Sequence, residues 1–312
     1  MRPTDRAFDR ASPHGIVLAF CGFERRSSFI CRLGPNMSRG IAATLPPTGS
    51  ERELENRSLY ISAGWAVEPA QKALEDAIVE AARLQERLTI DISSMPRRFL
   101  ADVVERLTSG TGTRPESVRF LYCPGDFDQT YRAAGRDVNL SATPVSPYFA
   151  GSHRATSIPV GLVVGLGLEP HRALGIMELL EPVRTWVFKS DAADHRYRGA
   201  TDDVNRQVLA DFGPNAVFDY DLHSLESIYF ALESLAYASR NDYRLILAPS
   251  GPKIFALACL LVGSKRSRER PAVWRVGGAE SGAGMDVAET GSVVCADVEL
   301  GPVQASQGLA NA

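Results

Sequence analysis

The chain contains little lysine, since four of its 34 basic residues are lysines and the other 30 are arginines. It has no Cys-x-x-Cys pair, and its histidine spacing matches no zinc signature, so we expect no metal ion and no cofactor. No apolar run reaches the length that a membrane helix needs, which excludes a spanning segment at the level of sequence. The formal net charge of -3 argues against nucleic-acid binding through bulk charge.

The five cysteines mostly lie in or beside apolar runs, at positions 21, 31, 123, 259 and 295. This placement is typical of buried, reduced thiols in a cytosolic protein. Residues 1–12 are polar and carry charges of both signs, so they lack the apolar centre of a signal peptide. Together these features predict a cytoplasmic location.

Strand and helix patterns alternate along the chain, and 45% of its residues are hydrophobic. We predict strands over residues 15–20, 59–63, 88–92, 118–123, 158–164, 185–188, 216–220, 244–248 and 272–276. We predict helices over 68–87, 97–107, 171–180, 202–212, 222–239 and 254–262, and a long loop over 34–57. This order predicts an α/β fold with mainly parallel sheets.

The pattern divides into two tandem Rossmann-like units. We expect a flexible leader over residues 1–13, a first half over 14–123, a linker over 124–157, a second half over 158–276 and a disordered tail over 277–312, in which 292–298 could form an isolated strand. An apolar strand runs into Gly22-Phe-Glu24 in one half and into Gly167-Leu-Glu169 in the other, with similar elements after each. This similarity indicates an internal duplication.

Ligands of open parallel sheets bind beyond the carboxyl ends of the strands, at helix N-termini. In the second half, Ser250-Gly251-Pro252-Lys253 joins a strand to a helix, and free backbone N–H groups with a lysine there suit a phosphate or carboxylate. In the first half, Asp91, Ser94 and Arg97 occupy the corresponding turn. Ordinary helix capping with a solvated basic side chain is the alternative for both turns.

Glutamate and arginine recur in the turns after the first strand of each half. Glu24 is followed by Arg26, and Glu169 by Arg172, so each turn offers a carboxylate for ribose hydroxyls and a guanidinium for phosphate. The alternative is an internal ion pair that braces the turn. Lys189 also falls at a predicted strand end, where we expect it to add positive charge.

Three further residues are candidates for acid–base catalysis at strand ends of the second half, namely Asp219, Asp221 and His223. No Gly-x-Ser-x-Gly elbow and no Walker A loop is present. The residues therefore predict a site without specifying a reaction.

The turns Ser93-Ser94 with Arg97 and Ser250-Gly251 with Lys253 give the chain a resemblance to the CARF-type Rossmann-like sensor domains of prokaryotic defence systems. The resemblance is architectural and spans residues 15–276. It implies a cyclic oligonucleotide held across a two-fold axis, and an effector protein as partner, because no effector domain is evident in the chain. Resemblance of this kind argues fold better than function.

These observations favour a cytoplasmic binding or sensor module for a small phosphorylated, nucleotide-derived ligand. A hydrolase or transferase acting on a nucleotide or sugar phosphate is the alternative, with Asp219, Asp221 or His223 as base. A non-catalytic scaffold is the third hypothesis. It predicts that the polar strand-end residues pair with one another and leave no pocket.

Overall fold

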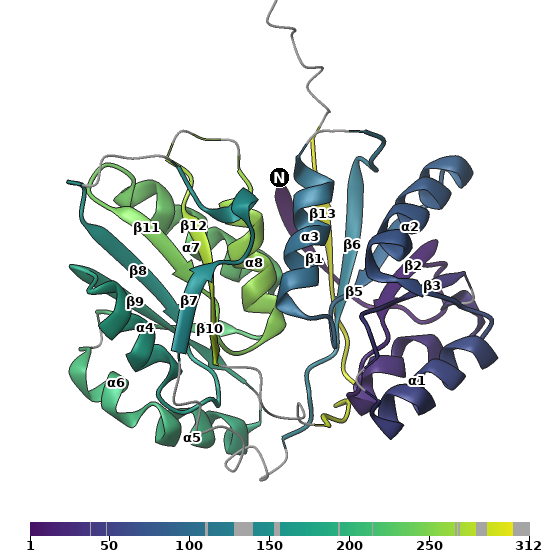
Figure 1. Cartoon of the computed structure of the whole chain (residues 1–312), viewed down its shortest axis with the longest axis horizontal. Coiled ribbons are helices and arrows are strands. Elements are labelled where there is room, and N and C mark those ends of the chain that lie inside the picture. Colours follow the sequence, from purple (N-terminus) through teal and green to yellow (C-terminus); the bar gives the residue numbers. More distant parts are fainter. Residues whose placement is uncertain are drawn as a thin grey trace, which may run out of the picture.

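The structure, a computed structural model, contains two mainly parallel sheets side by side, with helices α3 and α8 between them (Figure 1). It describes residues 1–37, 39–47, 49–109, 112–127, 140–152, 157–192, 194–213, 215–265, 267, 269–278 and 286–301. The predicted α/β class, with two Rossmann-like units and mainly parallel sheets, is confirmed.

The first sheet has seven strands in the order β4-β3-β2-β5-β6-β13-β1. Their bounds are β1 Arg2–Arg6, β2 Ile16–Phe20, β3 Gly40–Thr44, β4 Ala66–Pro69, β5 Leu88–Asp91, β6 Ser117–Tyr122 and β13 Val294–Glu299. The strands from β2 to β6 are parallel, and β13 and β1 add antiparallel. In the register, Leu18 lies opposite Ile41 on one side and Ile90 on the other, in the buried centre of the sheet.

The second sheet has six strands in the order β10-β9-β8-β11-β12-β7. Their bounds are β7 Leu140–Pro144, β8 Val160–Gly165, β9 Arg184–Asp191, β10 Val217–Asp221, β11 Arg244–Ala248 and β12 Ala272–Gly278. Only β7 runs antiparallel to its neighbour. Counted along the chain, both halves place their five parallel strands in the order 3-2-1-4-5, so they share one topology. An internal duplication predicts this shared order, and the duplication itself stays a prediction.

Eight α-helices of the described residues cover the sheets, some of them amphipathic. Their bounds are α1 Glu51–Ser62, α2 Ala70–Leu84, α3 Arg97–Thr108, α4 Arg172–Leu180, α5 His195–Val204, α6 Arg206–Asp211, α7 Leu225–Ser239 and α8 Lys253–Gly263. Short 3₁₀ helices span η1 Arg25–Ser28, η2 Ile30–Arg32, η3 Pro35–Met37 and η5 Pro147–Phe149. In the described part of the chain, each helix is too short or too polar to cross a membrane.

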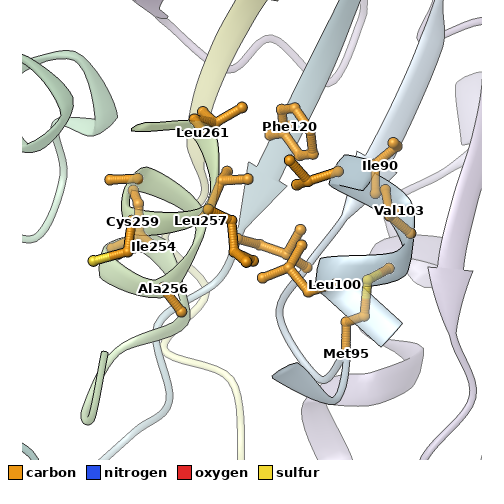
Figure 2. Close-up of a cluster of buried hydrophobic side chains, with 14 of the residues drawn as sticks. Ile90, Met95, Leu100, Val103, Phe120, Ile254, Ala256, Leu257, Cys259 and Leu261 are labelled. Atoms are coloured by element: carbon orange, nitrogen blue, oxygen red, sulfur yellow. The ribbon is translucent and has the colours of Figure 1, made fainter. Parts of the chain in front are cut away.

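Helix α8 is buried on all sides from Ile254 to Gly263 because it lies between the two sheets. Figure 2 shows Leu257 of α8 and Leu100 of α3 at the contact between these helices. A single apolar cluster passes through this contact and includes residues from both sheets. Burial on every face explains why the sequence of α8 is apolar throughout rather than amphipathic.

The two halves exchange their last strands. The strand that follows β6 in sequence is β7, which pairs with β12 of the second sheet. The strand that follows β12 is β13, which pairs with β6 of the first sheet. Each sheet is therefore completed by a strand whose chain neighbour lies in the other sheet.

Three of the predicted segments contain strands of the two sheets. Residues of the expected leader form β1, residues of the expected linker form β7, and β13 lies in the expected tail, close to the isolated strand considered over 292–298. Strand β1 is polar because it is an edge strand, held by backbone pairing with β13 and by Asp5, which accepts hydrogen bonds from Ser224 and Glu226 of the second half. Edge strands of this kind carry no apolar alternation for a sequence to reveal.

The long loop predicted over 34–57 and the strand predicted over 59–63 are wrong, because these residues form β3 and α1. Helix α1 escaped recognition because its pattern is inverted. Leu54 and Ile61 are 60% and 57% exposed, whereas Asn56 is only 1% exposed. Apolar periodicity cannot detect a helix whose inward face carries an asparagine.

Candidate functional site

A cavity of about 610 Å³ lies between the two sheets, at the carboxyl ends of their parallel strands. Most of its lining residues lie at or just after the ends of strands β2, β5, β6, β8, β9, β10 and β11. Three more residues precede the antiparallel β13. In the strand order 3-2-1-4-5, the direction of winding reverses between β2 and β5 in one sheet and between β8 and β11 in the other. The loops at both of these switch points reach the cavity, which is where open α/β sheets bind ligands.

The loop after β2 is fixed by buried hydrogen bonds. Ser27 Oγ donates to Phe20 O at 2.6 Å and accepts from the Gly22 amide at 2.9 Å. Asn56 Nδ2 donates to the carbonyl oxygens of Gly22 and Glu24 at 2.8 and 2.9 Å, and its Oδ1 accepts from Ser28. The buried asparagine of α1 therefore positions the turn that carries Glu24.

Glu24 lies between two cations at the floor of the cavity. Its carboxylate accepts from Arg26 Nε at 2.5 Å and lies 3.4 Å from Lys253 Nζ of the other half. Burial raises the pKa of Glu24, but the charges and hydrogen bonds of Lys253 and Arg26 outweigh it and hold the pKa below its ordinary value. Burial lowers the pKa of Lys253 to about 8, with Arg26 and Arg97 acting in the same direction and Glu24 against it.

A second carboxylate, that of Asp91, is buried behind this group. Its Oδ1 accepts from the backbone N–H of Ser93 at 2.9 Å and from the Ser93 hydroxyl, and its Oδ2 has no hydrogen-bond partner in the described part of the chain. Burial raises the pKa of Asp91 to about 6, although Ser93, Arg26 and Lys253 act to lower it.

Helices α3 and α8 begin at the cavity in the same way. Each has a proline before its first residue, Pro96 or Pro252, with φ -59° and ψ 141°, and each starts with a basic residue. The basic side chains cross between the halves: Arg97 Nη2 donates to Gly251 O at 2.6 Å, and Lys253 Nζ donates to Ser93 O at 2.8 Å. The first residue of each helix is therefore hydrogen-bonded to the loop that precedes the other helix.

Gly251 is required by the close approach of two loops. It has a φ of +81°, and a Cβ atom built there would lie 2.2 Å from Leu166 O. Because L side chains rarely adopt this conformation, only glycine fits without strain. The loop before α8 can therefore pack directly on the loop after β8.

The remaining wall of the cavity is aromatic and apolar. Phe127 and Tyr197 meet edge to face with ring centroids 6.3 Å apart, and the Arg196 guanidinium lies 5.7 Å from the Phe127 ring centroid. The other members of this wall are Phe23, Tyr122, Leu168, Leu222 and Val287. A planar ring could stack on such a surface.

The cavity brings together half of the fourteen residues selected from the sequence. Those that line it are Glu24, Arg26, Arg97, Glu169, His223, Gly251 and Lys253. Asp91, Ser94 and Ser250 are buried and absent from the lining, and Ser94 Oγ donates to Phe20 O at 2.9 Å. Their observed contacts are structural.

Four further selected residues also lie outside the described lining. Lys189 Nζ donates to Asp202 at 2.9 Å, and Arg172 Nη1 donates to Glu169 at 2.9 Å, which is the internal ion pair considered above. Asp219 is exposed beside Lys189, and Asp221 accepts from the backbone N–H of His223 at 2.8 Å. Lys189 is thus paired with a carboxylate outside the lining, whereas Arg172 is paired with Glu169 of the lining itself, so a direct role of either in ligand binding stays a prediction.

Several site residues escaped the sequence analysis. Val287, Thr290 and Ser292 precede β13 in a segment expected to be disordered, and Asn56 lies in the unrecognised helix α1. Phe127 follows β6, and Tyr197 lies in the first turn of α5, and neither has a motif around it. A search for aromatic residues just after predicted strand ends could have found Phe23, but nothing in the sequence connects residues 287–292 with this site.

In the described residues, no group of histidine, cysteine, aspartate or glutamate side chains is arranged to hold a metal ion. All five cysteines are buried and unpaired. The polar side chains of the cavity lining are its carboxylates and guanidiniums, Lys253, His223 and the hydroxyl groups of Tyr122, Thr290 and Ser292.

No protein-family model and no curated protein matches the chain. One solved structure to which the chain is similar is that of Anabaena Alr3699/HepE in complex with UDP-glucose. It aligns at 11% sequence identity over 78% of this chain and 82% of that chain, with a TM-score of 0.21. A TM-score of 0.21 carries no argument, so fold and site rest on the geometry described above.

Proposed function

We propose that the cavity binds a small phosphorylated, nucleotide-derived ligand, as a binding or sensor module. The observation that carries this proposal is the convergence of Arg26, Arg97 and Lys253 on one cavity at which both switch points meet. The scaffold hypothesis predicts paired strand-end residues and no pocket, and the cavity argues against it.

An anionic group fits the polar floor for two reasons. Guanidinium and ammonium groups form charge-assisted hydrogen bonds with phosphate oxygens. Helices α3 and α8 also begin here without side-chain caps, so their positive N-terminal ends add to the attraction.

A nucleotide fits the rest of the cavity. Phe23, Phe127 and Tyr197 offer surface for stacking a base, and Glu24 and Glu169 can accept hydrogen bonds from ribose hydroxyls. The volume of about 610 Å³ lies within the usual range for small-molecule sites. A sensor retains its ligand unchanged and passes the signal to a partner, which we propose is an effector protein in the cytoplasm.

The test is a thermal-unfolding panel of mono-, di- and cyclic oligonucleotides, with each mixture also assayed for product. A ligand present at about 100 times its dissociation constant adds about 2.7 kcal/mol of stability, which is readily measured as a shift in Tm. We expect a shift without product. The absence of a shift with every compound contradicts the proposal.

A matched pair of variants tests whether binding occurs in the cavity. Ser292 is exposed and lines the cavity, so Ser292→Trp fills part of it without disturbing the core. Ser62→Trp places the same side chain at an exposed position on α1. We expect Ser292→Trp to abolish the ligand-induced shift and Ser62→Trp to preserve it. Equal shifts in the two variants place the ligand elsewhere.

The alternative function is a hydrolase or transferase acting on a nucleotide or sugar phosphate. One observation favours it: His223 lines the same cavity as Lys253, where an imidazole could serve as general base. Product in the panel assay, lost in His223→Gln with binding retained, identifies this function instead.

A further inference from the structure

The basic residues of the cavity lining differ in how their charges are balanced. Arg26 and Lys253 lie near two carboxylates, the partly buried one of Glu24 and the buried one of Asp91, so the charges of these four side chains sum to zero when all are ionised. The other acidic residues of the lining have arginines of their own: Glu169 pairs with Arg172 at 2.9 Å, and Asp194 pairs with Arg196 at 2.7 Å.

Arg97 is the exception. Within the described ranges it forms no ion pair, and its recorded hydrogen bond goes to the neutral carbonyl of Gly251. Its Nε atom is buried and has no hydrogen-bond partner there. A partly buried guanidinium with no counter-ion is unfavourable unless a ligand supplies the negative charge.

We infer that Arg97 is the phosphoryl-binding residue of the cavity, and that Lys253 is the counter-ion of Glu24 rather than a phosphate ligand. This inference rests on the proposed function and assigns one part of the ligand to one part of the site. A phosphoryl group that accepts from the Arg97 guanidinium supplies the negative charge that balances it. The Glu24 carboxylate is then left to accept from hydroxyl groups of the sugar.

The experiment measures binding of inorganic phosphate by calorimetry to the full chain and to variants. Arg97→Met removes the unbalanced charge, and Arg98→Met, on the exposed side of the same helix turn, is the matched control. We expect Arg97→Met to weaken phosphate binding about tenfold or more, since hydrogen bonds to charged groups are the strong ones, and Arg98→Met to leave it within about twofold. Equal affinities in Arg97→Met and wild type overturn the inference.

The role of Lys253 is tested by the double variant Glu24→Gln with Lys253→Met, which removes both charges of the pair. We expect phosphate affinity to stay within about threefold of wild type, because the local charge balance is kept. A loss as large as in Arg97→Met shows that Lys253 binds phosphate and overturns the assignment. If the wild type binds neither phosphate nor any nucleotide, the proposed function fails and this inference with it; if it binds and only the variants disagree, the assignment alone fails.

Discussion

At the scale of single residues, the buried carboxylate of Asp91 is subject to opposing influences. Burial favours its protonated form, whereas Ser93, Arg26 and Lys253 favour its ionised form, and the outcome is a pKa of about 6 against an ordinary value of 3.8. Because the folded-state pKa lies above the unfolded value, the folded state binds more protons between these two values. This residue therefore lowers stability as the pH rises through that window.

We expect the free energy of unfolding of the wild type, measured relative to Asp91→Asn, to fall by roughly 3 kcal/mol between about pH 4 and pH 6. Urea denaturation at several pH values measures it. Asp76→Asn, at a partly exposed position on α2, is the control. Its free energy of unfolding should differ from that of the wild type by an amount that changes much less with pH. Parallel pH profiles for wild type and Asp91→Asn contradict the expected titration.

At the scale of elements, the contact between α3 and α8 fixes the position of the candidate site. The same two helices that carry Arg97 and Lys253 at their first residues bury Leu100 and Leu257 against each other a turn later (Figure 2). The spacing of the two basic side chains is therefore set by apolar packing, and a change in this packing also changes the site.

We expect Leu257→Ala to lower the free energy of unfolding by about 2–5 kcal/mol, because it removes a fully buried side chain and leaves a cavity. Urea denaturation measures the loss, and ligand affinity should fall as the helix starts shift. The control is Leu179→Ala on α4, where the leucine is 54% exposed, so a small effect is expected. Similar losses in both variants argue against a packed interface.

The sequence revealed these two helices but not α1 or β1, and it indicated a strand at β13 without its partners. The basic residue after a proline at the start of α3 and α8, and the apolar run of α8, were visible as local patterns. In contrast, α1 is held by the inward Asn56, and β1 and β13 are held by pairing between chain ends far apart in sequence. Local periodicity carries no information about such contacts.

At the scale of the whole molecule, the strand exchange and the shared apolar core join the halves into one unit. We expect a single cooperative unfolding transition. Trp65 reports on the first half, and Trp186 and Trp274 report on the second. Two variants separate these signals, Trp65→Phe and the double variant Trp186→Phe with Trp274→Phe. In each variant, the unfolding midpoint measured by fluorescence should coincide with the midpoint measured by circular dichroism. A fluorescence midpoint separated from the circular-dichroism midpoint indicates independent halves.

The predicted halves, the strand-end location and seven of the lining residues followed from the sequence because parallel α/β topology places chemistry at strand ends. The roles of the individual residues within the site did not follow from the sequence. Lys189 and Lys253 look alike in the sequence, since each follows a strand, yet Asp202 holds one and Glu24 the other. Which carboxylate reaches which cation depends on the packing of the two sheets.

The position of β13 has a consequence for the order in which the protein can be built. During synthesis β1 and β6 emerge well before β13, yet β13 lies between them, and β1 pairs with no other strand in the described structure. The first half therefore cannot complete its sheet as a nascent chain. Domains near the N-terminus usually fold first on the ribosome. Here β1 can pair only after β13 has been synthesised. The part of the cavity wall contributed by residues 287–292 likewise forms only after the second half has been made.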